Sequence, residues 1–201
     1  MAPELPDLGR HSVIVRLPDL DADELVPACE VLCQEGFKLW TVAVAQLSQL
    51  PALLRFFGRR ARIGVHGITE PGEVAAAAAA GAAFASSDFA LRELVAAVED
   101  FPVVLGGLTP SELRAGMVAG AAAVQLVPSE AFGTSYARVL PQLLAPYPLI
   151  ASGRIERYQA ELWLESGGVA VCPRDLIGPE AVLGDSLDGL RVTLQSWRLG
   201  D

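Results

Sequence analysis

Residues 101–128 read FPVVLGGLTPSELRAGMVAGAAAVQLVP, and this stretch indicates the fold class. It opens with a short apolar run, Pro102–Leu105, that ends at two glycines. Thr109 is then a good N-cap, with proline at the first helical position and Glu112 three residues further on, which is a capping-box arrangement. A second apolar run, Ala123–Val127, follows the helical pattern and stops at a proline. The stretch therefore predicts two strands joined by a helix.

The same pattern recurs from one end of the chain to the other. Short apolar runs alternate with longer helical patterns, which predicts parallel strands joined by crossover helices. Eight strands with short connections favour a closed α/β TIM (β/α)8 barrel over an open doubly wound sheet, and the length fits a single domain over residues 1–201. The predicted strands are Val13–Val15, Leu39–Val44, Arg62–His66, Ala83–Ala85, Pro102–Leu105, Ala123–Val127, Pro148–Ala151 and Val169–Val171.

Helix signals fill the intervals between these strands. Asp21 is the predicted N-cap of a helix that ends at Gly36. Cys29 and Cys33 are spaced i, i+4 in this helix, so we expect them to share a face as small core residues. Further helices are expected around residues 50–57, from Pro71 onward, through Leu91, Leu94 and Val95, and within residues 187–198.

Composition excludes several classes of function. The formal charge of -9 and the pI near 4.7 disfavour nucleic acid, because phosphates require a basic surface. The alanine-rich run Val74–Ala85 is too short to span a bilayer, so no membrane association is expected. The three cysteines form no even disulfide set and no secretory signal is evident, so we expect a cytoplasmic protein. No glycine-rich nucleotide loop follows a strand, and no cofactor is expected.

Reacting groups in such barrels project from the carboxyl ends of the strands and from the loops that follow. The candidate catalytic positions on this face are Thr41, His66, Gln125 and Glu130. The candidate ligand-binding positions are Ser87, Asp88, Ser152, Gly153, Arg154 and Arg174. The two histidines are far apart in sequence and no acidic cluster is paired with them, so no metal site is expected.

Each candidate has an ordinary structural alternative. Arg154 and Arg174 could jointly bind an anion, or each could pair with a nearby loop carboxylate in solvent. Gln125 needs hydrogen-bond partners inside the barrel, for which Ser152 or His66 are candidates, or it orients a bound small molecule. His66 is a general base, a metal ligand or a lone hydrogen-bonded histidine. Glu130 is a base or a loop carboxylate that caps a helix or faces water.

Three segments carry a resemblance to a known family. They are residues 80–85, residues 101–113 and residues 124–130, in this order and spacing. The chain resembles the 2-keto-3-deoxy-6-phosphogluconate (KDPG) and 4-hydroxy-2-oxoglutarate (KHG) aldolases from about Val13 to Leu176. The resemblance implies a class I aldolase-like barrel, a homotrimer, and cleavage of a 2-keto acid to pyruvate and an aldehyde through a Schiff base on lysine.

The functional positions depart from the family pattern. Gln125 stands where the family has its Schiff-base lysine, and an amide nitrogen cannot form an imine. Thr41 replaces the acid/base glutamate, and Ala45 replaces an arginine that binds the substrate carboxylate. The only lysine, Lys38, opens its strand and should lie at the opposite end of the barrel. Gly153-Arg154 and Cys172-Pro173 replace glycine pairs that bind phosphate in the family.

These departures leave three hypotheses. The first is a barrel without Schiff-base activity that binds a small anionic metabolite, such as a keto acid or sugar phosphate, or serves a structural role. The second is a lyase with rewired chemistry that uses His66, Glu130 or an added metal. The third is a non-catalytic oligomer, for which an apolar surplus could supply subunit contacts. The residues considered for such contacts are Trp40, Phe56, Phe57 and Trp163.

Overall fold

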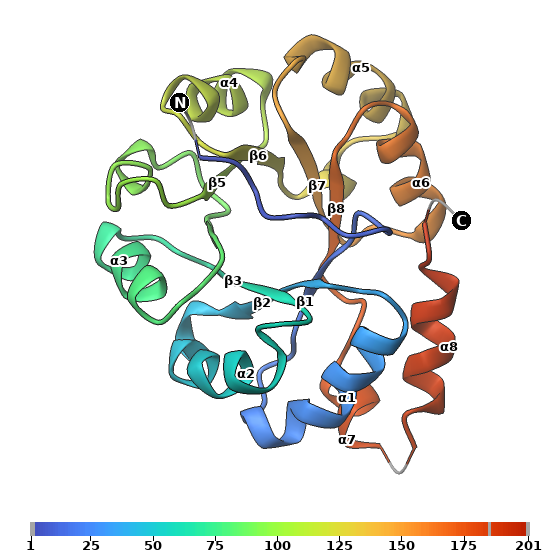
Figure 1. The fold of residues 1–201 in the computed structure, drawn as a ribbon. Coiled ribbons are helices and arrows are strands. Elements are labelled where there is room, and N and C mark those ends of the chain that lie inside the picture. The colour runs from blue at the N-terminus through green and yellow to red at the C-terminus, as the bar shows by residue number, and fades with distance from the viewer. Residues whose placement is uncertain (1–2, 185, 200–201) are drawn as a thin grey trace.

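A computed structural model describes residues 3–184 and 186–199 of the chain. Eight parallel strands form one sheet in the order of the sequence. A bridge between Val13 and Val171 joins the first strand to the last, and the Val171 N–H donates to the Ser12 carbonyl at 2.9 Å. The predicted (β/α)8 barrel is therefore confirmed (Figure 1). The strands are β1 (Ile14–Arg16), β2 (Leu39–Ala43), β3 (Arg62–His66), β4 (Ala85–Ser86), β5 (Val103–Gly107), β6 (Ala123–Leu126), β7 (Leu149–Gly153) and β8 (Ala170–Pro173).

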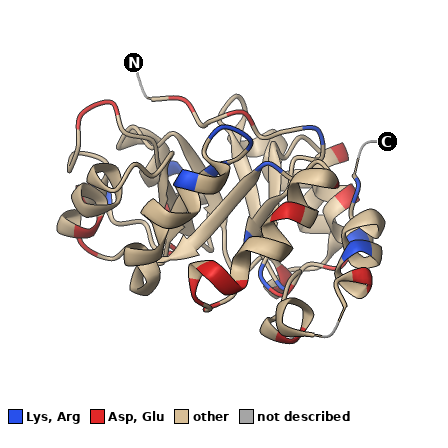
Figure 2. Cartoon of the chain, turned by 60° about the horizontal axis from the view of Figure 1, so that its bottom comes forward, with Lys and Arg blue, Asp and Glu red and all other residues tan. Residues whose placement is uncertain are grey.

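Helices surround this barrel and bury their apolar faces against the outer side of the strands (Figure 1). The α-helices are α1 (Ala22–Gln34), α2 (Leu50–Phe57), α3 (Pro71–Ala79), α4 (Pro110–Val118), α5 (Thr134–Leu144), α6 (Arg157–Glu165), α7 (Pro179–Leu183) and α8 (Asp188–Ser196). Three 3-10 helices are η1 (Val44–Gln49), η2 (Arg92–Leu94) and η3 (Ser129–Ala131). Charged residues of both signs lie mainly on helices and loops, whereas the strands are almost free of them (Figure 2). Within the described part of the chain, every helix is too short or too polar to cross a bilayer.

Local sequence signals explain most of these boundaries. The Thr109 and Leu108 N–H groups both donate to Glu112, and the Glu112 N–H donates to the Thr109 hydroxyl, so the predicted capping box starts α4. Gly36 adopts a φ of +86° directly after the first helix, as a helix-ending glycine does. Cys29 is fully buried and Cys33 is partly buried on the same helix. Burial raises the pKa of the Cys29 thiol to about 12.

One helix prediction was wrong. The helix expected through Leu91, Leu94 and Val95 is only the single turn η2, because the chain before it is tied to β5 by a hydrogen bond from the Gly106 N–H to the Phe89 carbonyl.

Of the aromatic residues named as candidates for subunit contacts, Trp40, Phe57 and Trp163 are buried within the chain. Only Phe56, which is 45% exposed, remains on the surface.

The side chains that point into the barrel form two layers, because successive residues of a strand face opposite sides of the sheet. The lower layer, nearer the amino ends of the strands, is apolar. It consists of Ile14, Leu39, Gly64, Phe84, Val104, Ala123, Ile150 and Ala170. The upper layer lies two residues further along each strand and consists of Arg16, Thr41, His66, Ser86, Gly106, Gln125, Ser152 and Cys172.

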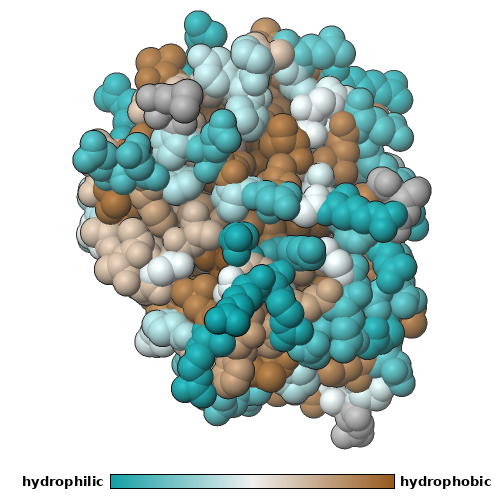
Figure 3. Space-filling model, viewed as in Figure 1, coloured by the Kyte–Doolittle hydropathy of each residue, from teal (hydrophilic) through white to brown (hydrophobic). Residues whose placement is uncertain are grey.

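The amino end of the barrel is closed by the N-terminal segment. Leu5 and Leu8 pack against the lower layer from below. Figure 1 shows this segment crossing the opening, and Figure 3 shows apolar atoms between polar groups on the same face. In the lower layer, the ring of Phe84 lies so close to Gly64 that a Cβ there would be 2.5 Å from a ring atom. The lower layer is therefore a packed core that separates the amino end of the barrel from its carboxyl end.

Candidate functional site

The upper layer places polar side chains from seven strands around one point. Arg16, Thr41, His66, Ser86, Gln125 and Cys172 line a cavity of about 10 Å³ above the apolar core. A cavity of this size holds about one water molecule. The mouth of the barrel is thus filled by the protein's own side chains.

Asp88, in the loop after β4, lies at the centre of this mouth. Its Oδ1 accepts from Arg16 Nη2 at 3.3 Å and from Gln125 Nε2 at 3.2 Å, and its Oδ2 accepts from Arg174 Nη2 at 2.5 Å. The Arg16 side chain is 12% exposed, while those of Asp88 and Arg174 are 28% and 35% exposed. Two guanidinium groups facing one carboxylate leave one net positive charge here.

Arg16 has two further contacts inside the barrel. Its Nε donates to Cys172 Sγ at 3.5 Å, and its Nη2 donates to Ser152 Oγ at 3.4 Å. The distance to Ser152 is long for an N–H···O hydrogen bond, and a thiol sulfur is a weak acceptor, so these two neighbours satisfy the guanidinium only weakly. Arg16 is the last residue of β1, one residue beyond the predicted end of this strand at Val15, and so is not among the predicted site residues. The two-residue alternation from Ile14 would have identified Arg16 as inward-facing.

The backbone of Asp88 is held firmly even though its side chain meets solvent. A Cβ at Gly106 would lie 2.4 Å from the Asp88 carbonyl carbon, so the loop packs directly on β5 where only glycine fits. The Phe89 N–H donates to Ser87 Oγ at 3.2 Å, and the Phe89 carbonyl accepts from Gly106. Because Gly106 has no side chain, the backbone of Asp88 can approach β5 closely, and this approach sets the position of the Asp88 carboxylate.

Gln125 does not use the partners expected from the sequence. Its Nε2 donates to the Ser87 carbonyl at 2.8 Å and to Asp88, whereas contacts with Ser152 or His66 had been expected. The amide thus fastens the loop after β4 to β6. At 3% exposure, Gln125 is among the most buried polar residues described.

His66 is paired with Thr41 across the same layer. His66 Nδ1 and Thr41 Oγ1 are 3.0 Å apart. Burial, together with the positive charge of Arg16, lowers the pKa of His66 to about 4, although Asp88 acts in the opposite direction. The imidazole is therefore neutral at pH 7 and contributes no charge to the mouth.

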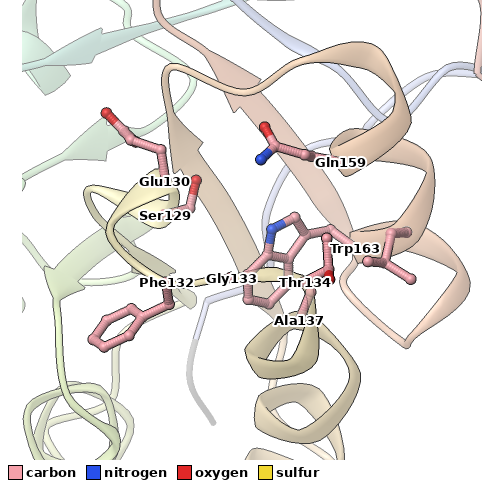
Figure 4. Close-up of a pocket in the computed structure, with 9 residues that line it drawn as sticks. Ser129, Glu130, Phe132, Gly133, Thr134, Ala137, Gln159 and Trp163 are labelled. Carbon is pink, nitrogen blue, oxygen red and sulfur yellow. The ribbon is translucent and has the colours of Figure 1, made fainter.

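Glu130 lies apart from this cluster. It shares a separate pocket with Ser129, Gln159 and Trp163, between η3 and the start of α6 (Figure 4). Its carboxylate lies over Gly153, where a Cβ would collide with it. The buried Ser129 hydroxyl has no hydrogen-bond partner among the described residues. The structure does not bring Glu130 to the Gln125 amide.

Arg154 and Arg174 do not converge on one point. Arg154, whose side chain is 78% exposed, pairs with Asp175 at 2.9 Å outside the mouth. Arg174 instead turns inward to Asp88, 86 residues away in sequence. The two arginines that face Asp88 are therefore Arg16 and Arg174, and not Arg154 and Arg174.

Lys38 lies at the other end of the barrel, as predicted. It immediately precedes β2, its side chain is exposed, and its carbonyl accepts from the N–H of Arg62 at the start of β3. Its Cβ lies beside Gly9 in the N-terminal segment. The packed lower layer separates this amine from Gln125. Among the described residues, no three His, Cys, Asp or Glu side chains gather as a metal site would require.

Comparisons with known proteins agree with this architecture. A family model described as KDPG and KHG aldolase matches residues 9–188. The KDPG aldolase of Legionella pneumophila, solved with pyruvate captured as a covalent carbinolamine intermediate, is 21% identical with a TM-score of 0.79, and 94% of each chain is covered. The enzyme from Zymomonas mobilis ATCC 29191 is 16% identical with a TM-score of 0.81, covering 94% of this chain and 93% of that one.

A designed protein also shares the fold. A cube-shaped cage made by fusing symmetric oligomeric domains is 22% identical over 92% of this chain and 70% of its own, with a TM-score of 0.80. At these identities the solved structures establish the fold alone. A search of curated proteins gave no significant match.

Proposed function

The chain belongs to the KDPG and KHG aldolase family, and from this premise we propose that it binds a small anionic metabolite without cleaving it through a Schiff base. The observation that carries the proposal is the position of the only lysine. Lys38 is exposed beside the amino end of β2, on the far side of a packed apolar layer from Gln125. Imine formation requires an amine that reaches the substrate carbonyl. In the barrel mouth, the position where the family has its lysine carries the amide of Gln125.

The side chains proposed for acid/base catalysis are also poorly suited to exchange a proton near neutral pH. Thr41 has no proton equilibrium near neutral pH, and a pKa of about 4 makes His66 a neutral imidazole that is only a weak base there. Glu130, the base of the rewired-lyase alternative, lies in a different pocket. These positions argue against catalysis by the rewired-lyase route.

The charge of the mouth supports an anionic ligand. Arg16 and Arg174 exceed Asp88 by one positive charge, and both guanidinium groups already grip a carboxylate. Arg174 uses Nη2 for Asp88, while its buried Nε has no partner among the described residues. A ligand carboxylate that bridged Nε and Nη2 would complete the two-pronged geometry that guanidinium groups favour. The Nε of Arg174, which has no partner among the described residues, is the second observation that supports the proposal.

The ligand class proposed is a small keto acid or sugar phosphate. The relative from Legionella pneumophila was solved with pyruvate, which makes pyruvate a natural first probe. We further propose one domain over residues 1–201, a homotrimer and a cytoplasmic location. The oligomeric part is supported by the symmetric oligomeric domains of the related cage.

Calorimetric titration with pyruvate and with a sugar phosphate tests the proposal. Replacing Arg16→Met or Arg174→Met should weaken binding about tenfold or more, since a charge-assisted bond contributes roughly 1.5–3 kcal/mol. Arg154→Met is the matched control, because it removes a guanidinium from the same face that pairs only with Asp175. Binding that is equal in all three variants, or absent from the wild type and from every variant described below, would refute the proposal.

A further inference from the structure

We infer that Asp88 is a built-in substitute for the ligand carboxylate, which closes the site until a ligand displaces its side chain from Arg16 and Arg174. The inference rests on the proposed function and adds the way in which the site is regulated. Nothing in the sequence pattern around Asp88 indicates this, because its partners come from β1, β6 and the loop after β8.

The contacts of Asp88 are those expected of a bound carboxylate. Each of its two oxygens meets a different arginine, and Oδ1 also accepts from Gln125 Nε2. A small anion entering the mouth would seek the same donors. Ligand and Asp88 therefore compete for one position.

The donors themselves make this competition unavoidable. The cavity beneath the Arg16 guanidinium is about 10 Å³, which is too small for pyruvate, and Asp88 is not one of the residues that line it. An anion that binds Arg16 and Arg174 must therefore take the place of the Asp88 carboxylate above this cavity. Asp88 is the side chain best able to move, because it is 28% exposed while that of Arg16 is 12% exposed and Gln125 is 3% exposed.

The motion required is that of a side chain and not of a loop. The backbone of Asp88 packs on Gly106, and the Phe89 carbonyl accepts from the Gly106 N–H at 3.2 Å. The carboxylate, by contrast, is held among the described residues only by the two arginines and by Gln125. Rotation of the Asp88 side chain toward solvent would free all three donors at once.

Titration of Asp88 variants with pyruvate tests the inference. Asp88→Asn and Asp88→Ala should bind pyruvate about tenfold more tightly than the wild type, the factor expected if roughly nine molecules in ten are closed by Asp88. Asp175→Asn is the matched control, an exposed carboxylate on the same face that pairs with Arg154, and it should not change the affinity. Circular dichroism verifies that each variant is folded.

The melting temperature is a second measurement, which tests the inference if a variant is too unstable for titration. If Asp88→Ala leaves Arg16 without a counter-charge, added pyruvate should raise its melting temperature more than that of the wild type. Pyruvate binding that is unchanged or weaker in both Asp88 variants, while Arg16→Met abolishes wild-type binding, would overturn the inference and leave the proposed function standing. Absence of pyruvate and sugar phosphate binding in the wild type and both Asp88 variants would instead refute the proposed function.

Discussion

The two layers inside the barrel differ sharply although they lie only two residues apart on each strand. The lower layer contains apolar side chains and Gly64, and the ring of Phe84 fills the space that this glycine leaves. The upper layer contains an arginine, a histidine, a glutamine and hydroxyl groups, with Asp88 held above them. The lower layer is stabilised by packing, which any apolar side chain of suitable shape can provide. The upper layer is held together by hydrogen bonds, which require a donor and an acceptor at matching positions.

This difference predicts how each layer responds to substitution. Changes in the upper layer alter the polar contacts that hold Asp88 and its loop. Changes in the lower layer create cavities or collisions in a close-packed interior. Stability should therefore respond more strongly to the lower layer, and ligand binding to the upper layer.

The largest expected effect comes from Phe84→Ala in the lower layer. Loss of this ring should lower the free energy of unfolding by about 3–5 kcal/mol, because the cavity next to Gly64 cannot be refilled by a neighbouring side chain. Ser86→Ala, two residues further along the chain, is the upper-layer control, with an expected loss below about 1 kcal/mol. Urea unfolding measures both. Equal losses in the two variants would contradict the distinction between the layers.

A smaller effect is expected from acid titration of His66. Its pKa of about 4 in the folded protein is below the ordinary value of 6.5, so between these pH values the unfolded chain binds a proton that the folded chain does not. Stability is therefore complete above about pH 6.5 and falls as the pH drops toward 4, by at most about 3 kcal/mol, since one unit is worth about 1.4 kcal/mol. His66→Asn should flatten this dependence. An NMR titration of His66 that gave a midpoint near 6.5 would contradict the prediction.

The smallest expected effect is that of Gln125→Met. Methionine has nearly the same shape but leaves the buried Ser87 carbonyl without its donor, which should cost about 1–2 kcal/mol. Gln142→Met, at an exposed position on α5, should change stability by less than about 0.5 kcal/mol. Chemical denaturation compares the two. A stabilised Gln125→Met protein would show that this amide bond does not hold the loop in place.

Local signals made the barrel predictable from sequence. The capping box at Thr109, the helix-ending Gly36 and the eight apolar runs each depend on residues close together in the chain. The placement of Lys38 outside the mouth followed from its position before β2 by the same local reasoning.

The partners in the mouth could not be predicted in this way. Arg16 and Asp88 are 72 residues apart, and Asp88 and Arg174 are separated by 86. Which arginine meets which carboxylate depends on how closely the loop after β4 approaches Gly106, and no periodicity reports that distance. The short turn η2 was missed for a related reason, because a tertiary contact with β5 overrides the helical pattern of its sequence.

Borohydride reduction in the presence of pyruvate, followed by peptide mapping of Lys38, tests the central claim most directly. Gln125→Lys, which places an amine in the upper layer, is the positive control for trapping. The account predicts that wild-type Lys38 carries no reduced pyruvyl group while residue 125 of the control becomes labelled. A pyruvyl adduct on Lys38 of the wild type would contradict it.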